Sequence, residues 1–102
     1  MKLTSIPTVP PISASEAHAE AFNALSHLSR LRVFFFLVGA GREVAAGEIQ
    51  AALGLPGPTL THHLDVLRRA QLVRRRKEAR FVYYSVVPET VSDLVRILTA
   101  CC

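Results

Sequence analysis

Residues 47–84, GEIQAALGLPGPTLTHHLDVLRRAQLVRRRKEARFVYY, decide the fold of this chain. A short helical pattern at about 46–53 is broken by LGLPGPT, and Pro58 suits the first turn of the helix that follows. Leu60, Leu64 and Leu67 then recur at the i, i+4, i+7 spacing of a helix face packed on a core. Two helices joined by a tight turn form a helix-turn-helix, and the second helix is predicted at about 58–70.

After Ala70 the periodicity changes from helical to alternating. Residues 73–77 and 81–87 are rich in β-branched and aromatic types, which predicts two strands joined by a turn near Glu78 and Ala79. A hairpin that directly follows a helix-turn-helix is the wing of a winged helix. We therefore expect a wing at about 73–87.

Three further helices are predicted outside this stretch. Ser13 or Ser15 can act as the N-cap of a first helix, and Ser29 can cap a second one. Pro88 suits the first turn of a last helix at about 88–102. The predicted fold class is mainly α, with five helices plus a two-stranded wing.

The length of 102 residues fits one domain, which we place at 14–102 after a Pro-rich and flexible N-terminal arm at 1–13. Half of the residues are hydrophobic, which excludes a disordered chain. The apolar run from Val33 to Ala40 is far shorter than the roughly 20 residues of a membrane span. The first residues lack the apolar region of a signal peptide, so we expect a cytoplasmic protein without a membrane partner, with reduced cysteines.

The first and last predicted helices both carry apolar stripes. So small a domain has little core in which to bury two such stripes, and a dimer interface is the natural alternative. We expect a homodimer whose interface includes Phe22, Leu25, Val91, Leu94, Val95 and Leu98.

Positive charge is concentrated in one segment. The net charge is +4, and seven of the twelve Lys and Arg residues fall within 68–80. A charge run is often only a solvated helix or strand face, but this one overlaps the end of the second helix and the wing. That position favours double-stranded DNA as the partner.

The second helix of a helix-turn-helix lies in the major groove with its N-terminal residues against base edges. In this chain those residues are Thr59, Thr61, His62 and His63. The phosphates beside the groove would be neutralised by the basic residues, namely Arg68, Arg69, Arg75, Arg76, Lys77 and Arg80. The two adjacent histidines point about 100° apart on a helix, so a shared metal site is a poor alternative.

The order of LSRLRV, THHLDVLRRAQLV and a basic hairpin that ends in FVYYSV resembles the ArsR/SmtB family of winged-helix repressors. The resemblance covers about two-thirds of the chain. It implies a homodimer that represses an operon by binding an imperfect inverted repeat, until a metal, metalloid or redox signal weakens the complex. No arrangement typical of an enzyme is visible in the sequence, so we expect a non-enzyme.

Departures from the family pattern reduce the number of candidate effector sites. Many arsenic and cadmium sensors of the family carry ELCVCDL, but the matching stretch is EVAAGEI, with Ala45 and Gly47 at the cysteine positions. The zinc sensors use Asp and His on the last helix, whereas this helix offers Asp93 and no histidine. A glycine common in the wing turn is replaced by Ala79, which adds strain if the position needs a positive φ.

Cys101 and Cys102 remain as the candidate effector ligands. The family includes arsenic sensors with a vicinal cysteine pair near the end of this helix. In a trivalent organoarsenical such as methylarsenite, carbon already fills one valence, so two thiolates complete the coordination, and this is the predicted effector. Inorganic arsenite or antimonite, which needs a third thiolate, is the alternative effector. A thiol redox sensor is a further alternative. Incidental terminal cysteines and a DNA-compacting protein are the non-sensing alternatives.

Overall fold

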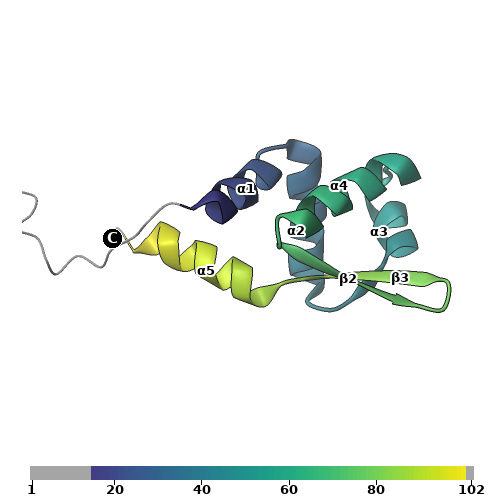
Figure 1. Ribbon diagram of the computed structural model, residues 1–102. Coiled ribbons are helices and arrows are strands. Elements are labelled where there is room, and N and C mark those ends of the chain that lie inside the picture. Colours follow the sequence, from purple (N-terminus) through teal and green to yellow (C-terminus); the bar gives the residue numbers. More distant parts are fainter. Residues whose placement is uncertain (1–14, 101–102) are drawn as a thin grey trace, which may run out of the picture.

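The computed structural model describes residues 15–100. Five helices and three strands follow one another in the order α1 (Glu16–Leu25), α2 (Leu28–Ala40), β1 (Val44–Ala45), α3 (Ala46–Leu53), α4 (Gly57–Arg69), β2 (Val73–Glu78), β3 (Phe81–Val86) and α5 (Pro88–Thr99). The α3–turn–α4 unit, the hairpin after it and the helix at each end confirm the predicted winged helix-turn-helix (Figure 1). The arm predicted at 1–13 and the two cysteines lie outside the described residues.

Local signals set most helix boundaries. Ser15 caps α1 because its side chain accepts a hydrogen bond from the backbone N–H of His18, at 3.2 Å. The N-cap of α2 is His27, whose side chain makes no capping hydrogen bond, so the cap predicted at Ser29 is wrong by two residues, and Ser29 lies inside the helix that begins at Leu28. Gly54 ends α3 in the left-handed conformation, with φ of 65°, which glycine adopts without strain.

The end of α4 turns the chain directly into the wing. The N–H of Leu72 donates to the carbonyl of Leu67, and the N–H of Gln71 donates to the carbonyl of Arg68, both at 3.0 Å. These two bonds define a Schellman motif in which Gln71, with φ of 65°, occupies the position usually held by glycine. The motif fixes where the wing leaves α4.

The wing belongs to a three-stranded antiparallel sheet with the order β1-β3-β2. Val44 pairs with Tyr84 and Ala45 with Tyr83, so β1 adds to the hairpin, and the expected two-stranded wing is incomplete. A strand of two residues has no periodicity to detect in the sequence. Ala79, in the turn between β2 and β3, does have a positive φ, of 55°.

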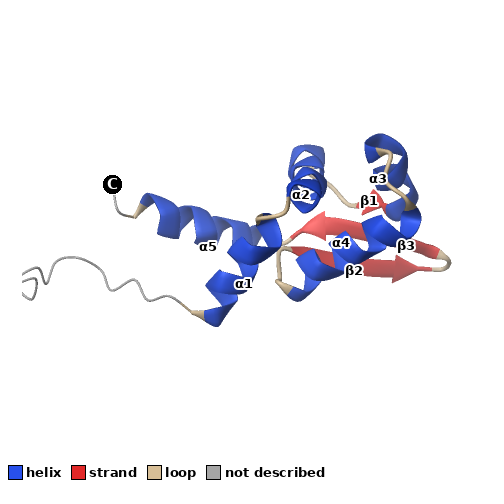
Figure 2. Ribbon diagram, turned by 90° about the horizontal axis from the view of Figure 1, so that it is seen from above, coloured by secondary structure: helices blue, strands red, loops and turns tan. Residues whose placement is uncertain are grey.

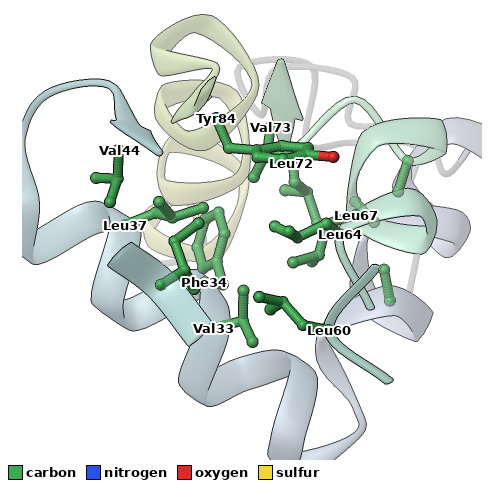
Figure 3. Packing of buried hydrophobic residues seen from close by; sticks show 14 of the residues in the cluster. Val33, Phe34, Leu37, Val44, Leu60, Leu64, Leu67, Leu72, Val73 and Tyr84 are labelled. Carbon is green, nitrogen blue, oxygen red and sulfur yellow. The ribbon is translucent and has the colours of Figure 1, made fainter. Parts of the chain in front are cut away.

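The core lies between α2, α4 and the sheet (Figure 3). It is closed by Val33 and Leu37 of α2, by Leu64 and Leu67 of α4 and by Leu72, each at most 1% exposed. The leucines at the predicted spacing of α4 therefore all point inward, as Figure 3 shows for Leu60, Leu64 and Leu67. This packing fixes which side of α4 faces outward.

Helices α1 and α5 project from one end of the molecule, and the β2–β3 hairpin extends at the other (Figures 1 and 2). The side chains of His18 on α1 and Asp93 on α5 approach to 3.3 Å, which joins the two helices. No helix among residues 15–100 is long and apolar enough to cross a bilayer.

The residues predicted for a dimer interface divide into two groups. Leu94 is buried in the protomer core, and Leu25 and Val91 pack against that core. Phe22, Val95 and Leu98 are 39%, 53% and 60% exposed. The first group is therefore largely used within the protomer, and the second gives α1 and α5 an exposed apolar surface.

Candidate nucleic-acid interface

The outward side of α4 carries the predicted base-reading residues with one exception. Thr59, Thr61 and His62 are exposed, because Leu60 and Leu64 anchor the opposite side of the helix in the core. His63 is only 5% exposed, so the prediction that it reaches a base edge is corrected. On a helix with 3.6 residues per turn, position 63 lies beside 60, 64 and 67 on the buried face.

His63 is held in an unusual environment for an imidazole. Its ring centroid lies 5.2 Å from that of His27, and its Nδ1 is buried without a hydrogen-bond partner. Burial lowers the pKa of His63 below its usual value, and the charges of His27, Arg30 and His62 lower it further. His63 is therefore a neutral packing residue that positions α4 against the junction of α1 and α2.

An open groove of about 590 Å³ separates α4 from the wing. Thr61, His62 and Asp65 line it from α4, and Arg75 lines it from β2. Two residues predicted for base edges, Thr61 and His62, and two predicted for phosphates, Arg68 and Arg75, thus share one concave surface. Such a surface matches the arrangement in which a helix enters the major groove and a wing lies beside it.

The two arginines at the end of α4 are not free cations. Asp65 accepts from Arg68 at 2.8 Å and from Arg69 at 2.9 Å, at i, i+3 and i, i+4 spacing. Sequence reasoning did not single out Asp65, although its spacing from the arginines in HLDVLRR contains this signal. The aspartate reduces the charge at this end of the helix and orients both guanidinium groups.

The wing has two different faces, because successive side chains of a strand point to opposite sides. On one face, Arg74 pairs with Glu89 at 3.3 Å and Arg76 pairs with Glu43 at 2.8 Å. Arg75 and Lys77 lie on the other face. Within residues 15–100, neither forms an ion pair within 4.0 Å, and the same is true of Arg80 near the turn.

Arg76 joins the sheet to the loop before β1. Its Nε and Nη2 donate to the two carboxylate oxygens of Glu43, at 2.8 and 2.9 Å, and its Nη1 donates to Glu78 at 2.7 Å. The guanidinium also lies 4.8 Å from the ring centroid of Tyr83. Hydrogen bonds from Arg76 lower the pKa of the Glu43 carboxyl. Two carboxylates already surround Arg76, so it is less available to a phosphate than Arg75, which has no ion pair within residues 15–100, and its predicted phosphate contact stays a prediction.

The described residues hold no cluster of three or more His, Cys, Asp or Glu side chains that could bind a metal ion. At the position of the family's cysteine ligands, Ala45 forms part of β1 and Gly47 lies in the first turn of α3. Asp93 is bound by His18 and Arg96. An effector site at Cys101 and Cys102 falls outside the described residues.

The class of protein that this geometry defines is a winged-helix DNA-binding protein, and comparison with known proteins agrees. Residues 25–76 match a family model described as a helix-turn-helix domain. A transcriptional repressor SmtB homolog of Synechocystis is 34% identical over 90 residues, which cover 88% of this chain and 67% of that protein. An HTH-type transcriptional regulator of Methanocaldococcus jannaschii is 31% identical, covering 81% of this chain and 92% of the regulator.

A solved structure gives the same result. The transcriptional regulator HlyU from Vibrio vulnificus is 34% identical and covers 81% of this chain and 84% of its own, with a TM-score of 0.64. The chain belongs to the helix-turn-helix transcriptional regulators of the ArsR/SmtB family.

Proposed function

We propose that the chain is a cytoplasmic transcriptional repressor that binds an inverted-repeat operator as a homodimer and releases it when a trivalent arsenical binds Cys101 and Cys102. The observation that carries the DNA-binding part is the groove between α4 and the wing, where Thr61 and His62 face Arg75. In this arrangement Thr59, Thr61 and His62 contact base edges, and Arg75, Lys77 and Arg80 contact phosphates. Arg68 and Arg69 contribute through guanidinium groups that Asp65 orients.

The homodimer is supported by the exposed apolar residues at the opposite end of the protomer. Phe22 of α1 and Val95 of α5 are 39% and 53% exposed, and α1 lies beside α5. A second copy that covers this surface excludes water from both helices. The twofold axis then places two α4 helices on successive major grooves, roughly 34 Å apart.

The effector assignment rests on the two thiols. Cys101 and Cys102 are the only cysteines of the chain, and they follow α5 after Ala100. Thiolates are soft ligands and prefer a thiophilic acceptor. Two thiolates and one carbon satisfy trivalent arsenic, so an organoarsenical such as methylarsenite is the preferred effector, with inorganic arsenite or antimonite as the alternative.

A mechanism for release follows from helix geometry. Adjacent side chains on an intact helix diverge by about 100°, so two thiolates that share one arsenic atom cannot both keep a helical arrangement. In our proposal, binding distorts the chain that continues α5, tilts one protomer against the other and changes the separation of the two α4 helices. By linkage, DNA and arsenical then weaken each other's binding by the same factor.

An operator-release titration tests the proposal. The full chain selects its operator from a random duplex library, and fluorescence anisotropy then follows release by methylarsenite, arsenite, zinc and hydrogen peroxide. We expect release at the lowest concentration with methylarsenite, and no release from the Cys101→Ser/Cys102→Ser variant, which still binds DNA. Release of that double variant by an arsenical contradicts the cysteine site.

The remaining outcomes identify the alternatives. Release by arsenite at lower concentration than by methylarsenite indicates the inorganic effector, and release by peroxide alone indicates a thiol redox sensor. Selection of no preferred sequence from the library contradicts a specific repressor and indicates a DNA-compacting protein.

A further inference from the structure

A second groove, of about 450 Å³, lies on the protomer away from α4. The end of α2 forms one wall with Leu37 and Val38, and the start of α5 forms another with Val91. The end of β3 closes it through Val86. A volume of this size with mainly apolar walls is typical of a small-molecule site.

Among the described residues, the unpaired polar groups of this groove can all donate hydrogen bonds, and none of them carries a negative charge. Ser85 and Ser92 line it, and neither hydroxyl has a side-chain hydrogen bond within residues 15–100. Arg42 also lines this groove, and its side chain is 57% exposed. Glu43 is the one carboxylate in the lining, and Arg76 already occupies both of its oxygens.

We propose that this groove binds a small apolar molecule that carries one carboxylate. Leu37, Val86 and Val91 enclose the apolar part, and Arg42 pairs with the carboxylate, to which the hydroxyls of Ser85 and Ser92 can donate. A cationic ligand is disfavoured, because Arg42 repels it and the carboxylate of Glu43 is already neutralised. The apolar walls equally disfavour a nucleotide, whose phosphates and sugar need many polar partners.

The ion pairs around this groove connect it to both elements that flank α4. Arg42 donates to Glu48 in the first turn of α3, at 2.6 Å, and Glu43 binds Arg76 of β2. A ligand carboxylate that pairs with Arg42 competes with Glu48 and so loosens the attachment of α3 to the loop before β1. We infer that the bound molecule changes DNA affinity, and this coupling, unlike the binding itself, rests on the proposed function.

Binding is tested by NMR titration of the full, ¹⁵N-labelled chain with octanoate, 1-octanol and octylamine, which share one alkyl chain. We expect saturable amide shifts at Val38, Val86 and Val91 with octanoate, at an affinity about tenfold above that of 1-octanol, because a charge-assisted hydrogen bond is added. Octylamine binds more weakly than 1-octanol.

Three variants locate the carboxylate. Arg42→Gln reduces octanoate affinity to that of 1-octanol, while Arg32→Gln, which removes an exposed arginine of α2 away from the groove, leaves it unchanged. Glu48→Gln removes the competing carboxylate, and so it tightens octanoate several-fold without affecting 1-octanol. A merely stabilising role of the Arg42–Glu48 pair predicts no such difference between the two probes.

Two outcomes overturn the binding site: the absence of saturable shifts with octanoate, or equal affinities for octanoate and 1-octanol in the unmodified chain. The coupling is tested separately with the selected operator at saturating octanoate. A change in the Kd for DNA that Arg42→Gln abolishes supports the coupling. An unchanged Kd with intact octanoate binding refutes the coupling alone, and failure of DNA binding without octanoate refutes the proposed function instead.

Discussion

The two faces of the wing lead to a prediction from adjacent residues of β2. Arg75 lines the groove beside α4 and has no ion pair within residues 15–100, whereas Arg76 is bound by Glu43 and Glu78. The substitutions Arg75→Gln and Arg76→Gln remove the same charge from neighbouring positions of one strand. Only the first removes a cation that is available to a phosphate.

The size of the effect follows from counterion release. Each phosphate neutralised on B-DNA contributes about −0.9 to the slope of log K against log salt concentration. Arg75→Gln should therefore reduce the magnitude of the slope by about 0.9 per protomer, whereas Arg76→Gln should leave the slope unchanged. Between about 50 and about 200 mM salt, loss of one contact amounts to a difference of roughly 3.5-fold in the salt dependence of affinity.

The measurement is a salt series of anisotropy titrations on the selected operator, with both variants checked by circular dichroism. Lys77→Gln removes a second cation that has no ion pair in the described part of the chain and lies on the same face as Arg75. Glu43→Gln removes one of the two carboxylates that bind Arg76. If Arg76→Gln lowers the slope as much as Arg75→Gln does, Arg76 contacts a phosphate and our assignment of the wing faces is wrong. If the slopes of all four variants equal that of the unmodified chain, the wing lies outside the DNA interface.

Three further predictions concern stability and assembly. Ala79→Gly should stabilise the fold by about 0.5–1 kcal/mol in urea unfolding, because it relieves the strain of a left-handed alanine with φ of 55°. As a control, Ala52→Gly in α3 should destabilise the fold by a similar amount. A loss of stability in Ala79→Gly contradicts the strain at Ala79. Burial lowers the pKa of His63 in the folded chain below the usual value of 6.5. As the pH falls through 6.5, the unfolded chain therefore binds more protons than the folded chain, and the free energy of unfolding decreases until the pH passes the lower pKa of the folded state. The free energy of unfolding should therefore decrease less between about pH 7 and about pH 5 in His63→Leu than in His62→Leu. Equal decreases in the two variants refute this role of His63. Val95→Glu should dissociate the homodimer in analytical ultracentrifugation, while Phe35→Glu, at an exposed apolar residue of α2, should leave it intact. If the Val95→Glu variant is still a dimer, the interface lies elsewhere.

The parts of the fold with strong local signals could be predicted from the sequence. Leu60, Leu64 and Leu67 mark one face of α4, and Pro58 marks its start. The change of periodicity after Ala70 locates the hairpin. Each signal acts over one or two turns of helix or one pair of strands, so no knowledge of distant contacts is needed.

The features that the sequence did not reveal depend on contacts between distant segments. Glu43 and Arg76 are 33 residues apart, and His18 and Asp93 are 75 apart. The strand β1 has two residues and exists because Val44 and Ala45 pair with β3. A basic run alone cannot distinguish Arg75 from Arg76, because that difference depends on which acids the fold brings to each face.

The two proposed ligand sites imply two different routes to the DNA interface. The cysteine pair follows α5 in the sequence. Helix α5 itself lies at the end of the protomer opposite the wing and contacts α1 through Asp93 and His18. A signal there acts first on the arrangement of the two protomers. The groove between α2, β3 and α5 instead adjoins Arg42 and Glu43, whose ion pairs lead to α3 and β2 within one protomer. A variant that abolishes dimerisation should therefore remove the effect of an arsenical on DNA binding while it preserves octanoate binding, since the second site needs no partner.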